Sequence, residues 1–371
     1  MNFPEVSIIL QNGRLGRVDD LGNGVPGLIV LMASSPTGHA FGDVKSYSRF
    51  VDLPAELKLV KALEYYFALA DGYKIYIMPV ASTTVISEAV DPVDDLPYAK
   101  QLMEAGNGEI RFIGVVGTML LAAMAATIGK AQDMYEYSVA QKSPLRVFLP
   151  YSFRTADVIS ALTSLTDNGV GVVVSYRGDE IGLLLGRLAS TPVQRHPGRV
   201  KDGPMPITDA RLDGAAGTPT NVEDDMVKVK ALHDAGYIVL GILIGKAGYY
   251  FMGMPMATAN TDDYGTIVNC RTIDKAFVVA YGVYLNELNE EVYVDAEGKL
   301  QAGYVKHMQA AVEEAIDRQM TANGEISGRK AFFDDQQDVI ATSEVSGSLD
   351  IQPVGHSSKI TINLGLTNSI A

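Results

Sequence analysis

Short apolar segments alternate with amphipathic segments between residues 27 and 176, and this alternation constrains the fold more than any other feature. The apolar segments have the length of buried strands and span residues 28–33, 74–80, 110–116, 145–149 and 170–175. Helical patterns lie between them, at residues 54–70, 99–105, 118–132 and 155–165. Because parallel strands need crossover helices, the pattern predicts an α/β fold with a mostly parallel mixed sheet and flanking helices.

One stretch of this region has nearly the length of a membrane span. Phe112–Gly129 is uncharged and apolar. It divides at Gly117, however, into a strand pattern followed by a helix pattern. We therefore expect a buried strand and helix, and no stable membrane insertion. The start of the chain contains Glu5 and lacks the basic-then-apolar order of a signal peptide, so we also expect no cleaved leader.

The alternation of strand and helix patterns stops after residue 188, and residues 188–219 are rich in proline and glycine. Beyond this junction we expect helices at 224–234, 271–288 and 304–320, and strands at 237–244, 250–256, 339–344 and 348–353. The predicted domains are an N-terminal arm and linker at 1–26, an α/β domain at 27–200, a C-terminal α+β domain at 201–355 and a C-terminal arm at 356–371.

Both arms carry the period-2 pattern of half-buried strands. In the C-terminal arm, Ile360, Ile362 and Leu364 alternate with Thr361 and Asn363. In the N-terminal arm, Val6, Ile8 and Leu10 alternate with Ser7 and Ile9. Edge strands are normally protected from pairing, so two such extended terminal strands suggest addition to a sheet in a neighbouring copy.

Composition excludes several classes of protein. The net charge of -14 argues against nucleic acid as a partner, because phosphate binding needs clustered Lys and Arg. Cys270 is the single cysteine, so no intrachain disulfide and no zinc cluster is expected.

Several short segments partly match catalytic or cofactor-binding motifs, but none has the flanking residues or secondary structure that the motif requires. Gly22–Gly27 spells GxGxxG but contains Pro26 and leads into a strand, whereas the dinucleotide motif opens a helix. Gly241–Lys246 resembles a phosphate loop but is followed by Ala247 instead of a hydroxyl. Gly324–Gly328 reads GEISG, which we interpret as a loop with Gly324 as a helix C-cap. The five histidines are scattered. We therefore predict no catalytic residue, no cofactor and no metal, and a protein that is not an enzyme.

Pairs of adjacent aspartates are the remaining candidates for metal binding or acid–base chemistry. They occur at 19–20, 94–95, 224–225, 262–263 and 334–335. Their neighbours favour a role as turn and cap residues. The alternative is a metal-assisted α/β enzyme that uses one pair as its site.

The order of several motifs resembles contractile tail sheath proteins. The C-terminal part carries IVNCRTIDKAFVVA at 267–280, DAEGKL at 295–300, the helical segment 305–320, GEIS at 324–327 and PVGHSSKITINLGL at 353–366. Earlier similar segments are GLIVLMASSPTG at 27–38, DGYKIYIMPV at 71–80 and GRLASTPVQRHPGRVKDGP at 186–204. The resemblance covers most of the chain and is strongest in its last third.

The resemblance implies the sheath of a bacteriophage tail or of a phage-like injection system. Copies would assemble in the bacterial cytoplasm into a helical homo-oligomer of stacked rings around an inner tail tube protein, with baseplate and tail terminator proteins at the ends. Segments 6–10 and 360–364 would exchange between copies, and contraction would drive the tube through a target cell envelope. Residues 27–200 would form the outer domain and residues 201–355 the sheath-type core.

A tube-facing surface is harder to identify. Lys299, Lys306 and Arg318 lie near or along the 304–320 helix and are candidates for an acidic tube. Acidic residues lie there too, so a solvated helix face is an equal alternative. A non-contractile, ring-forming scaffold protein is a further alternative for the whole chain.

Overall fold

The structure is a computed structural model that describes residues 24–93, 97–154, 157–176, 178–212, 219–288, 290–362 and 364. The chain divides by its internal contacts into two compact units, residues 1–282 and residues 283–371. Each unit is described by itself below.

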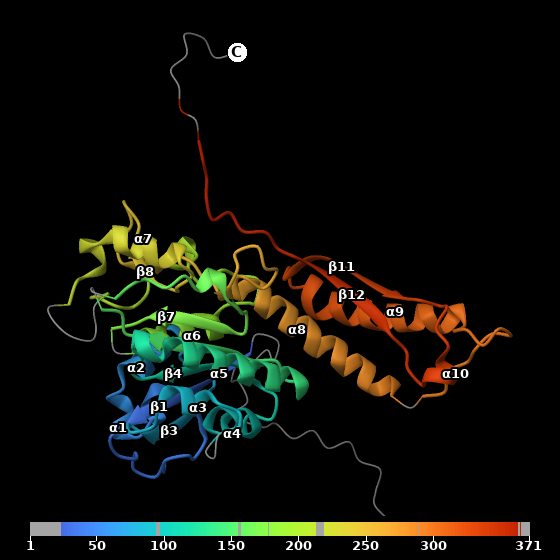
Figure 1. Cartoon of the computed structure of the whole chain (residues 1–371), viewed down its shortest axis with the longest axis horizontal. Coiled ribbons are helices and arrows are strands. Elements are labelled where there is room, and N and C mark those ends of the chain that lie inside the picture. The colour runs from blue at the N-terminus through green and yellow to red at the C-terminus, as the bar shows by residue number, and fades with distance from the viewer. Residues whose placement is uncertain are drawn as a thin grey trace, which may run out of the picture. The chain divides into compact units, whose positions relative to one another are not determined.

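The first unit is built on a six-stranded sheet (Figure 1). Its order is β2 (Lys45–Tyr47), β3 (Ile75–Ala81), β1 (Val25–Met32), β4 (Ile110–Val116), β5 (Arg146–Tyr151) and β7 (Val170–Val174). Every neighbouring pair is parallel except β2 with β3. The prediction of a mostly parallel mixed sheet is therefore confirmed.

Helices cover both faces of this sheet. A Cβ built at Gly27 in β1 would meet Leu102 of α4 (Tyr98–Ala105) at 2.8 Å. One built at Gly114 in β4, which is level with Leu28, would instead meet Ile181 of α6 (Glu180–Ser190). Since side chains 27 and 28 point to opposite faces, α4 and α6 lie on opposite sides. The remaining helices of the two layers are α1 (Ala55–Lys58), α2 (Lys61–Ala70), α3 (Ile86–Val90) and α5 (Leu121–Ala140).

The membrane-length stretch is a strand and a helix, as predicted. Residues 110–116 form β4 and residues 121–140 form α5. No helix among the described residues is long and apolar enough to cross a membrane.

Residues 191–282 complete the first unit with short elements. They are α7 (Met226–Asp234), most of α8 (Ile267–Tyr284) and the antiparallel pair of β8 (Leu240–Ile242) with β9 (Tyr249–Phe251). In addition, β10 (Ala257–Thr258) pairs with the earlier strand β6 (Thr166–Asp167). A parallel bridge from Val173 to Ile238 joins this region to the main sheet. The contact boundary at 282 thus differs from the predicted boundary at 200, and the assignment of outer and core domains stays a prediction.

The second unit is a small α+β body. It contains α9 (Ala302–Ile316), a following π-turn at Asp317–Thr321, β11 (Ile326–Phe333), α10 (Val339–Thr342) and β12 (Gly347–Pro353). Strands β11 and β12 form an antiparallel two-stranded sheet. A small apolar cluster joins Leu300, Val305 and Met308 to Phe333.

Three predictions of local structure are wrong. Residues 157–165, expected as part of a helix, contain only a 3-10 turn at Leu162–Ser164, because Leu162 N–H donates to the carbonyl of Ala235 at 2.8 Å. Residues 339–342, expected as a strand, form α10, since the Asp338 side chain caps Ala341 N–H and Ser343 ends the helix with a φ of 54°. Residues 326–328, expected in a loop, begin β11. Gly324 does adopt the positive φ of 67° expected of a C-cap.

Candidate assembly surface

The β11–β12 sheet has one face on α9 and one face exposed. On the inner face, Ala331 and Phe333 of β11 are buried and lie opposite Leu349 and Gly347 of β12. On the outer face, Lys330 lies opposite Asp350, and both are exposed. The alternation is that of a sheet with one buried side.

The side of β11 that faces away from β12 is closed by α9. Ala331 N–H donates to Oε1 of Glu313 at 2.8 Å, and Arg329 Nε donates to the carbonyl of Glu313 at 3.1 Å. The Arg329 guanidinium also pairs with the carboxylates of Glu313, at 3.5 Å, and Asp317. A carboxylate therefore takes the place that a further strand's carbonyl would occupy beside β11.

The far edge of β12 is open. In an antiparallel pair, opposite residues alternate between hydrogen-bonded and non-hydrogen-bonded pairs. Ala331 directs its N–H to Glu313, so Ala331 and Leu349 form a non-hydrogen-bonded pair. The N–H and C=O of Leu349, and by the same alternation those of Ile351, must then point away from β11. No third strand covers them among the residues that the structure describes.

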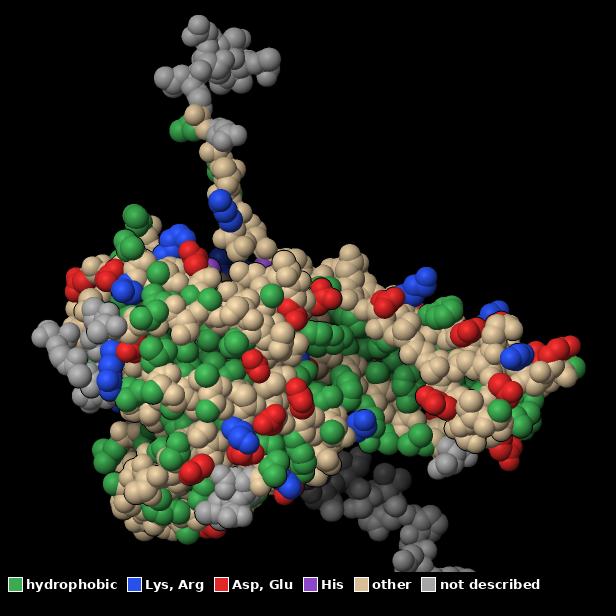
Figure 2. Space-filling model, in the orientation of Figure 1, with side chains coloured by type: hydrophobic (Ala, Val, Ile, Leu, Met, Phe, Trp, Pro, Cys, Tyr) green, Lys and Arg blue, Asp and Glu red, His purple; other side chains and the backbone are tan. Residues whose placement is uncertain are grey.

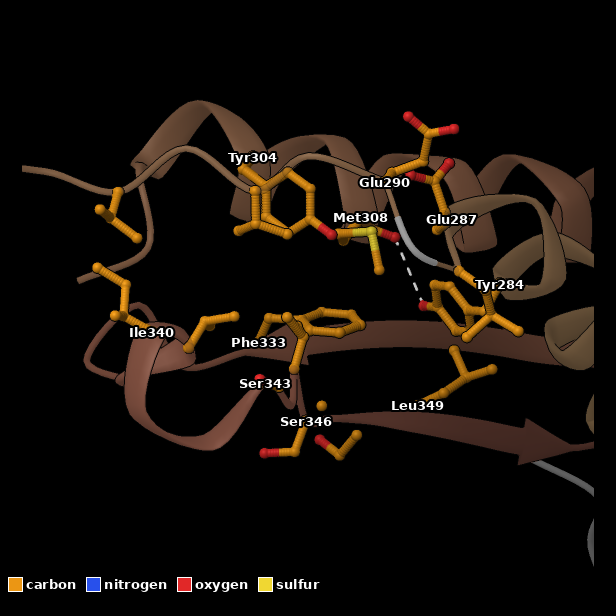
Figure 3. Close-up of a pocket in the computed structure, with 17 residues that line it drawn as sticks. Tyr284, Glu287, Glu290, Tyr304, Met308, Phe333, Ile340, Ser343, Ser346 and Leu349 are labelled. Carbon is orange, nitrogen blue, oxygen red and sulfur yellow. Dashed lines mark hydrogen bonds between the residues drawn. The ribbon is translucent and has the colours of Figure 1, made fainter. Parts of the chain in front are cut away.

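A groove of about 860 Å3 lies within the second unit, beside this open edge (Figure 3). Apolar and aromatic side chains dominate its lining, and Tyr284, Tyr304 and Phe333 surround the hollow. Leu349 contributes from β12, and Ile340 contributes from α10. The Tyr284 hydroxyl donates to the carbonyl of Met308 at 3.5 Å, which holds one ring at the groove wall.

The groove has an acidic rim. Glu287 and Glu290 lie on it, and Glu287 accepts a hydrogen bond from the ring of His307 at 3.2 Å. Burial, with the nearby carboxylates Glu287 and Glu313, raises the pKa of Tyr284 to about 12. Both this hydroxyl and that of Tyr304, whose pKa is raised for the same kind of reason, stay neutral at physiological pH. The groove therefore offers apolar surface inside and negative charge outside.

The predicted C-terminal exchange segment is exposed within its own chain. Ile360, Ile362 and Leu364 have relative exposures of 76%, 80% and 97%. With Thr361 they belong to no strand, and the segment extends beyond β12 (Figure 1). These three large apolar side chains thus lie against no surface of the described residues. Asn363 and the predicted N-terminal segment Val6–Leu10 lie outside the described residues.

The predicted tube-facing residues do not form one described cluster. Lys299 donates to the carbonyl of Gln336 at 2.9 Å and is half-buried. Lys306 and Arg318 are exposed but differ by 12 positions in sequence, which is about 18 Å along a helix and about a third of a turn around it. A tube-facing role for these residues stays a prediction. On the molecular face shown in Figure 2, basic and acidic side chains are interspersed.

The aspartate pairs act as caps and turn residues where they are described. Asp225 accepts from Lys228 N–H at the start of α7, Asp262 from Tyr264 N–H, and Asp334 from Gln336 N–H. No group of three or more His, Cys, Asp or Glu side chains suited to a metal ion occurs in the described part of the chain. The pairs at 19–20 and 94–95 lie outside it.

The sequence patterns did not predict the groove or the role of Glu313 at the edge of β11. Alternation of Leu349 and Ile351 with polar residues marked β12 as a half-buried strand, which was a usable signal. Glu313 looked like any surface carboxylate of an amphipathic helix. Only the approach of α9 to β11 gives it a role at the sheet edge.

Three solved structures have the same fold over nearly the whole chain. A chain of the anti-feeding prophage (AFP) baseplate has a TM-score of 0.63 at 15% identity and covers 99% of each chain. A chain of the contracted PVC sheath complex, from an extracellular contractile injection system, has a TM-score of 0.58 at 11% identity and covers 99% of this chain and 98% of its own. A sheath tail protein from Desulfitobacterium hafniense has a TM-score of 0.52 at 8% identity, covering 94% and 100%.

These likenesses identify the fold as that of contractile tail sheath proteins, as the sequence resemblance implied. The family follows from the sequence itself. The model described as DUF2586, N-terminal domain, matches residues 3–252, and that described as DUF2586, C-terminal domain, matches residues 263–371. The chain therefore belongs to the DUF2586 family. No curated protein matches the chain.

Proposed function

We propose that this protein is the subunit of a contractile sheath, in a phage tail or a phage-like injection system. It polymerises as stacked rings around an inner tube by exchanging terminal strands between copies. The observation that carries the proposal is the presence of two features in one chain: a β12 edge that no strand covers among the described residues, and exposed apolar residues Ile360, Ile362 and Leu364 in a segment whose sequence alternates like a strand. The sheath fold supports it.

Strand exchange suits a wall that must change shape. Main-chain hydrogen bonds would join the copies, and they depend little on how the bodies of the subunits are oriented. Each subunit body could then shift between two packings while the connections remain, and the difference in body–body contacts would store the energy of contraction. Contraction would drive the tube through a target cell envelope.

The partners follow from this role. They are further copies of the chain, an inner tail tube protein, and baseplate and tail terminator proteins at the two ends of the sheath. Assembly would take place in the bacterial cytoplasm, and the finished protein would belong to the tail or particle.

Deletion of residues 357–371 tests the proposal. The described residues of this segment are exposed, so the shortened chain is expected to keep its circular dichroism spectrum and unfolding temperature. It is also expected to lose all rings and tubes under negative-stain electron microscopy, whereas the full chain forms them. Tubes of normal length from the shortened chain would refute strand exchange.

The contractile role needs a second measurement. A sheath subunit should give two tube states that differ in length and diameter, the shorter one appearing after mild denaturant treatment. A non-contractile scaffold would give a single state, and a small closed oligomer with a bound ion would point to the enzyme alternative.

A further inference from the structure

We infer that the groove of the second unit receives the turn between β8 and β9 of a second copy, with Ile244 in the hollow and Lys246 at the acidic rim. This turn, residues 243–248, belongs to the first unit. The inference rests on the proposed assembly of copies, and it adds a contact between subunit bodies that does not involve the terminal segments.

The turn presents one apolar side chain without cover. Ile244 is 102% exposed, the highest value among the exposed large apolar side chains of the described residues. Residues 245–248 are exposed as well. Single exposed apolar residues are common on protein surfaces, so exposure alone assigns no role. Ile244 differs in being held on a fixed turn beside a positive charge.

Hydrogen bonds fix the turn and its base. Lys246 N–H donates to the carbonyl of Leu243 at 2.9 Å, which closes the turn. At the start of β9, the Tyr249 carbonyl accepts from Met205 N–H at 2.8 Å, and the Tyr249 hydroxyl donates to Glu223 at 3.0 Å. A turn that is already ordered loses little conformational freedom on binding, so docking it costs less than docking a flexible loop.

The groove matches an apolar side chain on a narrow turn. Its volume is about 860 Å3, and Tyr304 and Phe333 lie on opposite sides of the hollow (Figure 3). Gly245 follows Ile244 and has a φ of 82°, so no side chain beside Ile244 keeps the backbone of the turn away from the groove wall. Burial of Ile244 there would remove apolar surface of both partners from water.

Charge favours the same pairing. Lys246 is the only charged residue between Gly236 and Thr261. Glu287 and Glu290 lie on one side of the hollow (Figure 3). Because each copy has a net charge of -14, copies repel one another, and a positive tip against an acidic rim offsets that repulsion locally. Opposite charges at the edge of a contact also favour correct placement.

The contact suits an open or ring-shaped assembly. The turn and the groove are different surfaces, and every copy carries one of each. Such a heterologous contact repeats from copy to copy and generates rings or helical arrays. It would also orient one subunit body against the next.

Cysteine cross-linking tests the docking directly. A full-length Ile244→Cys variant is mixed with full-length Leu288→Cys or Ile340→Cys, both at exposed positions of the groove lining, and the mixture is assembled and oxidised. Gln352→Cys is the matched control, because it is exposed on the same unit but does not line the groove. The native Cys270 is fully buried, and a mixture without added cysteines measures its background.

We expect disulfide-linked dimers with at least one groove position, several-fold above the Gln352→Cys control. Assemblies in which the groove positions cross-link no better than the control would overturn the docking and leave strand exchange standing. Groove positions that link to Ile362→Cys and not to Ile244→Cys would make the C-terminal segment the occupant, which also overturns the docking. Full chains that form neither rings nor tubes would overturn the proposed function together with this inference.

Charge reversal tests the rim. Adding Lys246→Glu to the Ile244→Cys chain should lower its cross-linking to Ile340→Cys several-fold, and adding Glu290→Lys to the Ile340→Cys chain should restore it. Lys201→Glu makes the same charge change at another exposed position of the first unit and should leave the yield unchanged. A loss without restoration, or an equal loss from Lys201→Glu, would overturn the placement of Lys246 at the rim.

Discussion

Arg146 and Asp274 form a buried, two-pronged ion pair that ties α8 to the central sheet. Arg146 Nε lies 2.8 Å from Oδ2 of Asp274, and Nη2 lies 2.6 Å from Oδ1. Arg146 also donates to the carbonyl of Asn168 at 3.0 Å and lies 4.2 Å from the centre of the Tyr135 ring. Its side chain is 1% exposed. Burial would lower the pKa of Arg146, but the adjacent Asp274 carboxylate outweighs this and raises it, so the guanidinium stays charged.

Removal of Asp274 should destabilise the first unit strongly. Asp274→Ala leaves the Arg146 guanidinium buried without its anion, and breaking such a pair costs about 3–5 kcal/mol. The check is chemical unfolding of purified protein, followed by circular dichroism. Asp52→Ala is the control, since it breaks an exposed pair with Arg49 and should cost less than about 1 kcal/mol. Equal losses in the two variants would contradict the importance of the buried pair.

Stability should fall as pH rises through neutrality because of Glu180. Its carboxyl is buried at the start of α6, accepts from the Ser175 hydroxyl and from Tyr176 N–H at 3.1 Å, and has its pKa raised to about 7 by burial. The unfolded chain has the lower value of 4.5. The protonated folded state is therefore favoured below about pH 4.5, and this contribution is lost as pH rises through 7.

Glu180→Gln isolates that contribution. The amide cannot ionise but keeps an oxygen acceptor for Ser175 and Tyr176. The difference in unfolding free energy between the variant and the original chain should grow by about 3 kcal/mol between pH 4.5 and pH 8. A pH-independent difference would show that the folded-state pKa is not raised.

Two glycine-to-alanine substitutions should act in opposite directions. A Cβ at Gly182 in α6 would lie 1.8 Å from the carbonyl oxygen of Ala62 in α2, so the two helices would have to separate. We expect Gly182→Ala to cost about 1–3 kcal/mol or more, as overpacked cores do. Gly129→Ala, in α5, meets nothing within 4 Å and should stabilise by about 0.5–1 kcal/mol. Thermal unfolding measures both, and a neutral Gly182→Ala would contradict the close helix contact.

The apolar face of the C-terminal segment should matter for assembly, and its polar face should not. Ile362→Asp places a charge among the alternating apolar residues of the segment, and we expect tubes and rings to fall at least tenfold in sedimentation assays. Thr361→Asp adds the same charge to the adjacent polar position and should assemble nearly as well as the original chain. Since both residues are exposed in the single chain, neither variant should change its unfolding temperature. Similar losses in both would indicate that charge alone, and not the face, governs assembly.

The sequence predicted the central sheet because its strands are continuous apolar runs bounded by turn residues. Segments 75–81, 110–116 and 170–174 are such runs; the first two lie inside the six-stranded sheet and the third forms its last strand. Helix α6 was missed for a related reason: nearly all of its residues are buried, so Glu180–Ser190 shows no polar stripe. The helix expected at 155–165 does not form over its described residues 157–165, because Leu162 N–H donates to the distant carbonyl of Ala235 and the Asp157 carboxylate accepts local bonds from Tyr151 and Arg154.

At the assembly surface, the sequence by itself determined the alternation in segments 347–353 and 360–364, since period 2 is a local property of the chain. It also determined that charge and motif content favour a structural role. Only the tertiary structure decided which strand edge is open. The bond from Ala331 to Glu313 joins residues 18 apart through the approach of a helix to a strand, and nothing in local sequence encodes that approach.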